Sequence, residues 1–225
     1  MYLKKLLKQI RENKDALVEQ GVEVGSELIF DGIAGQVAPG IVAVRMAYKQ
    51  KQMENRVHKA LELIDNRMDT ILDLLAHLND YEYRFVEEKV FPIVFENIIN
   101  EDEEEKIKYI INSFETIIEN KIVDEELVLS YLDVIKSLRI IDIQHLYRQT
   151  SDYRKKLSME KRTLEPPDLS EIGQQRVALT KYIHNKLQQL GLIDIDVPVI
   201  PEEGPVTKFG YNLIDYIKEK GKASI

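Results

Sequence analysis

The sequence predicts a mainly α-helical protein: an elongated helical bundle with a long central helix, joined to a small C-terminal α+β domain. Apolar residues recur at steps of three and four along most of the chain, which is the period of an amphipathic helix. No proline or glycine interrupts residues 41–88, so one helix can extend through them. Two short strand-like pieces after residue 190 flank a Pro-Glu-Glu-Gly-Pro turn and supply the β part.

Composition narrows the class of protein. With 225 residues, 44% apolar and 31% charged, the chain can bury a core of its own. Cysteine is absent, which excludes disulfides, thiolate zinc sites and cysteine nucleophiles and agrees with a reducing compartment. The formal net charge of −8 argues against wholesale wrapping of nucleic acid. We expect a cytoplasmic protein, with peripheral attachment to the membrane as the alternative.

Residues 1–20 predict an amphipathic helix. Lysines at positions 4, 5 and 8 interrupt the apolar core that a signal peptide would need. One interpretation is an interfacial helix drawn to anionic lipid, and the other is a surface helix that packs its leucines on the protein body. We favour the second, because Glu12, Asp15 and Glu19 dilute the positive charge. The apolar face consists of Leu3, Leu6, Leu7, Ile10 and Leu17.

The segment 1–40 ends in the glycine- and proline-containing stretch "FDGIAGQVAPG". Its uncharged run, Gly32 to Val44, has 13 residues, whereas a membrane-spanning helix needs about 20. The glycines match neither phosphate-binding pattern, G-x-x-x-x-G-K-[ST] or G-x-G-x-x-G. We interpret the stretch as an apolar segment that breaks near Pro39-Gly40, before a helix that restarts at Ile41. A shallow contact with a membrane or a partner is the alternative.

A helical bundle is expected over residues 41–150. Its central helix, Ile41 to Glu88, would span roughly 65–70 Å, which is too long for a compact globule of this size. A further helix is predicted from about Asp102 to Asn120. The stretch "VDEELVLSYLDVIKSLRIIDIQHLYRQ" predicts another packed helix, whose apolar residues recur from Leu127 to Leu138, and a shorter helix near Gln144. The seam of the central helix alternates four- and three-residue steps, as in a coiled coil. Its members are Val57, Leu61, Ile64, Met68, Ile71, Leu75 and Leu78.

Two charged runs interrupt this pattern. The acidic run Glu101–Glu105 suits a helix N-terminus, where the dipole favours carboxylates, and it lacks the glycine and the spacing of a calcium loop. Between Arg148 and Arg162 lie six basic residues and two acidic ones, and Pro166-Pro167 follows. We place a basic linker at 151–167. Its alternative is a docking patch for an acidic partner or for phosphates.

The C-terminal domain is expected over residues 168–225. Asp168 and Glu171 predict a capping pair, a helix follows to about Leu190, and Gly191 ends it in the left-handed conformation. This end of the chain resembles the end of a winged-helix domain, in which "GLI", a wing and a "T-x-x-G" helix start follow a helix. The residues that match are Leu190, Gly191, Leu192, Ile193, Thr207 and Gly210.

The charge of this domain argues against DNA binding. From Glu165 onward the sequence contains nine acidic and seven basic residues. The expected wing carries Asp194, Asp196, Glu202 and Glu203, which have the wrong sign for phosphates. Contact with a protein is therefore the favoured use of this domain.

A second resemblance covers most of the chain. An apolar Gly/Pro segment, a long helical middle with "EEKIKYIINSF", "LGLI" and a terminal "T-x-x-G" helix follow one another. This order is similar to bacterial and phage proteins of the Abi-alpha (abortive-infection) type. The resemblance implies a phage-conflict or mobile-element context. It does not assign a catalytic role to any residue of this sequence.

The search for catalytic, cofactor-binding or metal-binding residues predicts none. The histidines at 58, 77, 145 and 184 are scattered and match no metal-binding spacing. Asp73, His77 and Asp80 share a helical face, but such residues on a charged helix are more often solvated. No nucleophile elbow or general acid–base pair is marked by spacing. We therefore expect no enzyme activity, cofactor or small-molecule substrate.

The predicted function is that of a non-enzymatic helical interaction protein, a phage-conflict, immunity or mobile-element factor. It would contact a protein partner, or a second copy of itself, through its bundle and C-terminal domain. One alternative is a peripheral membrane effector that uses residues 1–45. The other is a DNA-binding regulator that uses the C-terminal domain.

Overall fold

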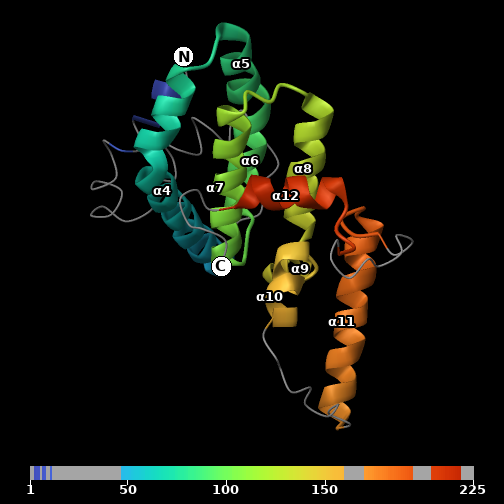
Figure 1. Ribbon diagram of the computed structural model, residues 1–225. Coiled ribbons are helices and arrows are strands. Elements are labelled where there is room, and N and C mark those ends of the chain that lie inside the picture. Colours follow the sequence, from blue (N-terminus) through green and yellow to red (C-terminus); the bar gives the residue numbers. More distant parts are fainter. Residues whose placement is uncertain are drawn as a thin grey trace. The chain divides into compact units, whose positions relative to one another are not determined.

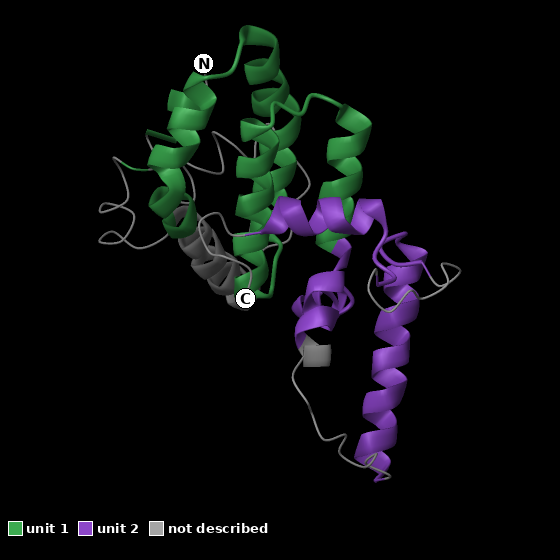
Figure 2. Cartoon of the chain, in the orientation of Figure 1, with its two compact units in different colours: residues 1–136, 219–225 green, residues 137–218 purple. Residues whose placement is uncertain are grey.

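The computed structural model describes residues 3–5, 7, 8, 11, 47–159, 170–194 and 204–218 (Figure 1). In these residues the chain is mainly helical, which confirms the all-α part of the predicted fold class. In place of a β-sheet, this part of the chain has one isolated antiparallel bridge, Ile193 to Val206. The chain forms two compact units, Met1–Lys136 with Glu219–Ile225 (unit 1) and Ser137–Lys218 (unit 2), coloured in Figure 2.

Unit 1 is built from helices whose apolar faces meet in one core. Helices α4, α6 and α7 pack against one another. The predicted seam is confirmed from Ile64 to Leu75, since Ile64, Met68, Ile71 and Leu75 are buried. Leu78, its last predicted member, is half-buried and lies after the end of α4. The side chains of Val57 and Leu61 lie outside the described residues. The elements are α4 (Ala47–Ala76), α5 (Asp80–Phe85), the π-helix η3 (Val86–Val90), α6 (Phe91–Ile99), α7 (Glu104–Glu119) and α8 (Glu125–Ser137).

The prediction of one continuous helix up to Glu88 is wrong, because α4 ends at Ala76. Asn79 starts a new helix instead. Its side chain accepts a hydrogen bond from Glu82 N–H, and the Glu82 carboxylate accepts one from Asn79 N–H, both at 2.9 Å. This reciprocal capping box favours a helix start over continuation of the seam.

Proline then changes the pitch of the chain after α5. Pro92 has no N–H, so a regular helix cannot close its bond to the carbonyl of Glu88. The preceding turn widens into η3, in which Phe91 N–H donates to the carbonyl of Val86. The segment around Pro92 is thus a helical passage from α5 into α6.

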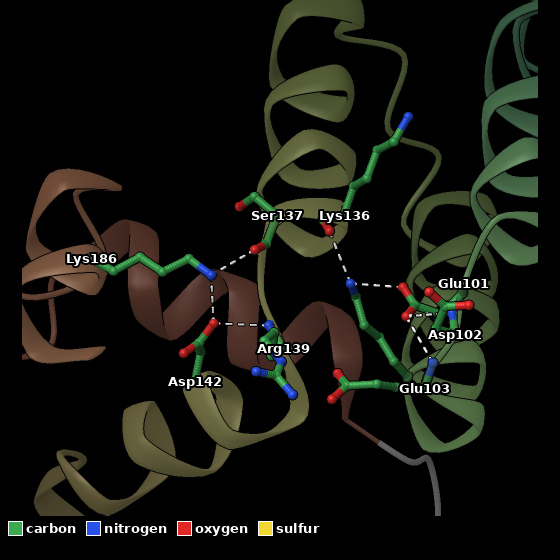
Figure 3. A network of polar contacts seen from close by, with 9 residues as sticks. Glu101, Asp102, Glu103, Lys136, Ser137, Arg139, Asp142 and Lys186 are labelled. Carbon is green, nitrogen blue, oxygen red and sulfur yellow. Dashed lines mark hydrogen bonds and ion pairs between the residues drawn. The ribbon is translucent and has the colours of Figure 1, made fainter. Parts of the chain in front are cut away.

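The acidic run lies at the start of α7, as predicted. Glu101 accepts from Asp102 N–H and Glu103 N–H, and its carboxylate pairs with Lys106 Nζ at 2.7 Å (Figure 3). Lys106 is buried and also donates to the carbonyl of Lys136 at 2.9 Å, in the last turn of α8. A buried ammonium group thus joins the beginning of α7 to the end of α8, where free carbonyls attract a cation.

The described N-terminal residues are helical and pack on the other helices of unit 1. Leu3 and Leu7 are buried, and Leu3 N–H donates to Glu87 Oε1 at 2.6 Å. Arg11 pairs with Asp65 and Asp69 of α4. These contacts support the interpretation in which the leucines pack on the protein body. Leu6, Ile10 and Leu17 lie outside the described residues, as does the predicted break at Pro39-Gly40.

Unit 2 contains α9 (Ile140–Arg148), α10 (Ser151–Met159), α11 (Glu171–Gln189) and α12 (Lys208–Ile217). Helix α10 occupies the first part of the predicted linker, while residues 160–169 lie outside the described residues. Ser170, not the predicted Asp168, caps α11, because its hydroxyl accepts from Gly173 N–H at 3.1 Å. Gly191 ends the helix region with φ +69°, which confirms the predicted left-handed stop.

A short clasp joins the end of α11 to the start of α12. Asp194 N–H donates to the Pro205 carbonyl at 2.7 Å, and Thr207 N–H donates to the Leu192 carbonyl at 3.0 Å. The hydroxyl of Thr207 donates to the Gly191 carbonyl and accepts from Gly210 N–H. Thr207 therefore caps α12, at the helix start that the resemblance to a winged-helix domain implied.

Substitution of two glycines of this clasp should have unequal effects. A Cβ at Gly210 would lie 2.3 Å from the Leu192 backbone oxygen, so Gly210→Ala must move the backbone. A Cβ at Gly191 meets nothing within 4 Å, and Gly191→Ala should cost about 1–2 kcal/mol for its left-handed conformation. We expect Gly210→Ala to cost more than Gly191→Ala in urea unfolding. An equal or smaller loss at Gly210 would contradict the close contact.

Candidate interaction surface on helix α11

Helix α11 has two halves that differ in burial. In the C-terminal half, Ile183 and Leu187 are buried within unit 2. In the N-terminal half, every side chain from residue 174 to residue 182 is exposed. Large apolar side chains are among them: Ile172 is 63% exposed, Val177 69%, Leu179 47% and Tyr182 64%. Large apolar side chains usually stabilise a fold by being buried. Four of them exposed on three turns of one helix therefore indicate a contact surface.

Three of these residues lie along one side of α11, whereas Val177 lies roughly 140° away from Ile172 around the helix. Ile172 and Leu179 are seven residues apart, and Ile183 follows four residues later, so all three lie along one line of the helix. The face that packs in the C-terminal half therefore continues, uncovered by described residues, over the N-terminal half. Tyr182 lies beside this line. We name Ile172, Val177, Leu179 and Tyr182 the α11 surface.

A polar cluster fixes the C-terminal half of α11. Lys186 Nζ lies 2.6 Å from Asp142 Oδ2 and donates to the Ser137 carbonyl at 2.7 Å (Figure 3). Asp142 is buried and also accepts from Arg139 N–H at 2.9 Å, at the start of α9. Such a charge-assisted hydrogen bond is stronger than a neutral one, and it is strengthened by burial. Helix α11 is thus held on α9 by one carboxylate.

Two histidines meet beside this anchor. The rings of His145 and His184 are 5.9 Å apart between centroids and nearly perpendicular. Gln149 Nε2 lies 3.4 Å from His145 Nε2, and Arg154 donates to Gln149 Oε1 at 3.1 Å. Burial lowers the pKa of His145, the His184 and Arg148 charges lower it further, and the Asp142 carboxylate opposes the shift. The neutral form of His145 is therefore favoured in the folded protein.

No pattern in the sequence predicts this histidine pair. His145 and His184 lie on different helices, and only the packing of α11 on α9 brings them together. The other histidine placed on a candidate face, His77, lies after the end of α4, and its Nδ1 is 2.8 Å from the Asp73 carbonyl. Among the described residues, no group of three or more His, Asp or Glu is arranged to hold a metal ion. The side chain of His58 lies outside that part of the chain.

A void in the core of unit 1 offers no reactive groups. Its volume is about 10 Å³, and its lining includes Leu7, Ile71, Phe95 and Phe114, all apolar. A space of this size holds at most one water molecule, and an apolar lining gives that water no partners. The void is therefore a packing defect of the core.

Comparison with family models, with curated proteins and with solved structures finds no match to this chain. Its function is therefore argued from the geometry of its own residues.

Removal of the anchor should destabilise unit 2. Lys186→Met leaves the buried Asp142 carboxylate without its ammonium partner, and we expect a loss of about 2–4 kcal/mol in the free energy of unfolding. Lys181→Met, at an exposed position of the same helix, is the matched control and should change it little. Urea unfolding measures both. Equal effects of the two variants would contradict the anchoring role.

Acidification should weaken unit 2 through His145. Its folded-state pKa lies below the unfolded value, chiefly because of burial and then because of His184 and Arg148, while Asp142, paired with Lys186, opposes the shift. Stability that is present above about pH 6.5 should therefore be lost as the pH falls through the folded pKa, because the unfolded chain binds the proton first. Urea unfolding across this range should show a smaller loss for His145→Gln than for wild type.

The control for this titration is His77→Gln, which changes an exposed histidine of unit 1. It should keep the pH dependence of wild type. If His145→Gln keeps it as well, His145 is not the group responsible.

Proposed function

We propose that this chain is a non-enzymatic helical interaction protein whose contact is made by the α11 surface. The observation that carries the proposal is the exposure of Ile172, Val177, Leu179 and Tyr182 on a helix whose other half is anchored. A rigid helix with exposed apolar side chains can bind with little loss of conformational entropy. The polar clusters support the same view, since Asp142 and Lys106 serve to join helices.

The cellular context of this function rests on the resemblance to Abi-alpha proteins. In that context the chain would act by contacting another protein, and the exposed apolar side chains of the anchored helix α11 support such a contact. The Ile193–Val206 bridge between α11 and α12 supports the resemblance to the end of a winged-helix domain. We include a winged-helix-like use of unit 2 for protein contact in the proposal.

Two alternatives have less support. A membrane effector through residues 1–45 would need its leucines at the lipid surface, whereas Leu3 and Leu7 are buried in unit 1. No helix among the described residues has both the length and the apolar character needed to cross a membrane. A DNA reader would not need the four apolar side chains of the α11 surface.

Site-specific photocrosslinking in the native host tests the proposal. Tyr182 is replaced by the photoreactive aromatic residue p-benzoylphenylalanine, and Tyr81, which is equally exposed on unit 1, is replaced in the control. We expect a distinct partner protein to be crosslinked from Tyr182 and not from Tyr81. Once purified, that protein should bind wild type directly.

The decisive measurement is binding of the purified partner to variants. Leu179→Ser should weaken binding by about tenfold or more if the apolar surface carries the contact. Leu127→Ser, at another exposed leucine, should leave it unchanged. Crosslinks that are the same from both tyrosines, or binding that is unaffected by Leu179→Ser, would refute the proposed function.

A further inference from the structure

The interface between α9 and α11 contains the histidine pair, which the proposed function does not use. The rings of His145 on α9 and His184 on α11 lie edge to face, with their centroids 5.9 Å apart. Both residues are half-buried, and His184 directly follows the buried Ile183. The two histidines are therefore part of the contact that holds the C-terminal half of α11 on α9.

The charged groups around this pair are mostly positive. Helices α10 and α11 both pack on α9, and each of the three helices contributes a cation. The groups are Asp142 and Arg148 of α9, Arg154 of α10, which donates to the glutamine side chain beside His145, and Lys181 and Lys186 of α11. Asp142 is the one carboxylate among them, and Lys186 already pairs with it at 2.6 Å.

Protons on both rings would place like charges against one another inside this group. Burial is the largest cause that lowers the pKa of His145, and the charges of His184 and Arg148 follow, whereas Asp142 opposes the shift. Once the helices separate, water can solvate both imidazolium ions and screen them from each other. The packed pair therefore takes up fewer protons than the separated helices do.

We propose that the histidine pair is a proton-operated switch, at which α11 separates from α9 while both helices stay folded. The pair lies between two helices, so separation relieves the repulsion and leaves the hydrogen bonds within each helix intact. A local opening of this kind costs less than global unfolding. The switch concerns the anchored half of α11 and does not depend on what the α11 surface binds.

Proton linkage sets how steep the switch can be. If the packed pair holds one proton and the separated helices hold two, the open-to-packed ratio rises by up to about tenfold for each pH unit below the ordinary histidine pKa of about 6.5. If the packed pair holds none, the rise is up to about a hundredfold. An open state of about one in a hundred at pH 6.5 thus reaches about one in ten or more at pH 5.5.

A metal ion fits the pair less well than a proton does. In the part of the chain that the structure describes, no third His, Asp or Glu joins the two rings in an arrangement that could hold a metal ion. The cations of all three helices would also repel a divalent ion. The chemistry of histidine itself, which changes its charge between pH 5 and 8, is the simpler use of this pair.

The test measures the distance between α9 and α11 in the full chain as the pH falls. The sequence has no cysteine, so Gln144→Cys and Gln189→Cys, at exposed positions, place one spin label on each helix. Distances between the labels are measured by pulsed electron paramagnetic resonance at pH 7.5, 6.5 and 5.5. We expect one distance distribution at pH 7.5 and a second, longer one whose population rises by about tenfold between pH 6.5 and 5.5. Far-UV circular dichroism should stay unchanged.

Histidine variants of the labelled chain identify the groups responsible. His145→Gln and His184→Gln each leave a single ring that can be charged, so each should keep the short distance at pH 5.5. The two variants check each other, because they alter opposite sides of the interface. His77→Gln, which changes an exposed histidine of unit 1, is the control and should open as the unsubstituted labelled chain does.

Three results would overturn the inference. The first is a distance between the labels that is the same at all three pH values. The second is opening that persists in both His145→Gln and His184→Gln, which would assign it to another group. The third is a loss of the far-UV signal in step with the change in distance, which would mean that unit 2 unfolds instead of opening.

Discussion

The hydrogen bonds of one ammonium group determine what α11 can do. Lys186 Nζ reaches the Ser137 carbonyl and the Asp142 carboxylate, and Asp142 also accepts from Arg139 N–H. Ser137, the start of α9 and the C-terminal half of α11, all of unit 2, are thereby joined through Lys186 and the buried Asp142. A charge buried in this way is costly to leave unpaired, which makes the arrangement specific. Because the anchor holds only one half of α11, the other half is left with its apolar side chains exposed.

Unit 1 uses a buried lysine in a related way. Lys106 pairs with Glu101 and donates to the Lys136 carbonyl, so one ammonium group satisfies both the acidic run before α7 and the last turn of α8. In both units a lysine ammonium group fills hydrogen-bond acceptors that a helix end leaves open, and Lys106 is buried while Lys186 is half-buried. Lys106 and Asp142 therefore hold helices together. Four exposed large apolar side chains lie on the N-terminal part of α11.

Local patterns predicted much of the fold because their physical causes are local. The four–three seam gave the buried face of α4, Gly191 gave the left-handed stop, and Thr207 gave the cap of α12. The break after Ala76 was missed although Asn79 and Glu82 have the spacing of a capping box, because the apolar seam was given more weight. The cap of α11 was assigned two residues too early, since Ser170 and Asp168 are both good caps and only the backbone geometry chooses between them.

The sequence by itself determined that this is a helical protein and where many of its helices begin and end, because helix periodicity and capping act over a few residues. Only the tertiary structure decided which faces stay uncovered. Ile183 and Leu179 have the same local pattern, yet one is buried and the other exposed, because α9 packs against one half of α11 only. The meeting of His145 with His184 and of Asp142 with Lys186 was decided in the same way, since contacts between distant residues depend on packing and leave no local trace.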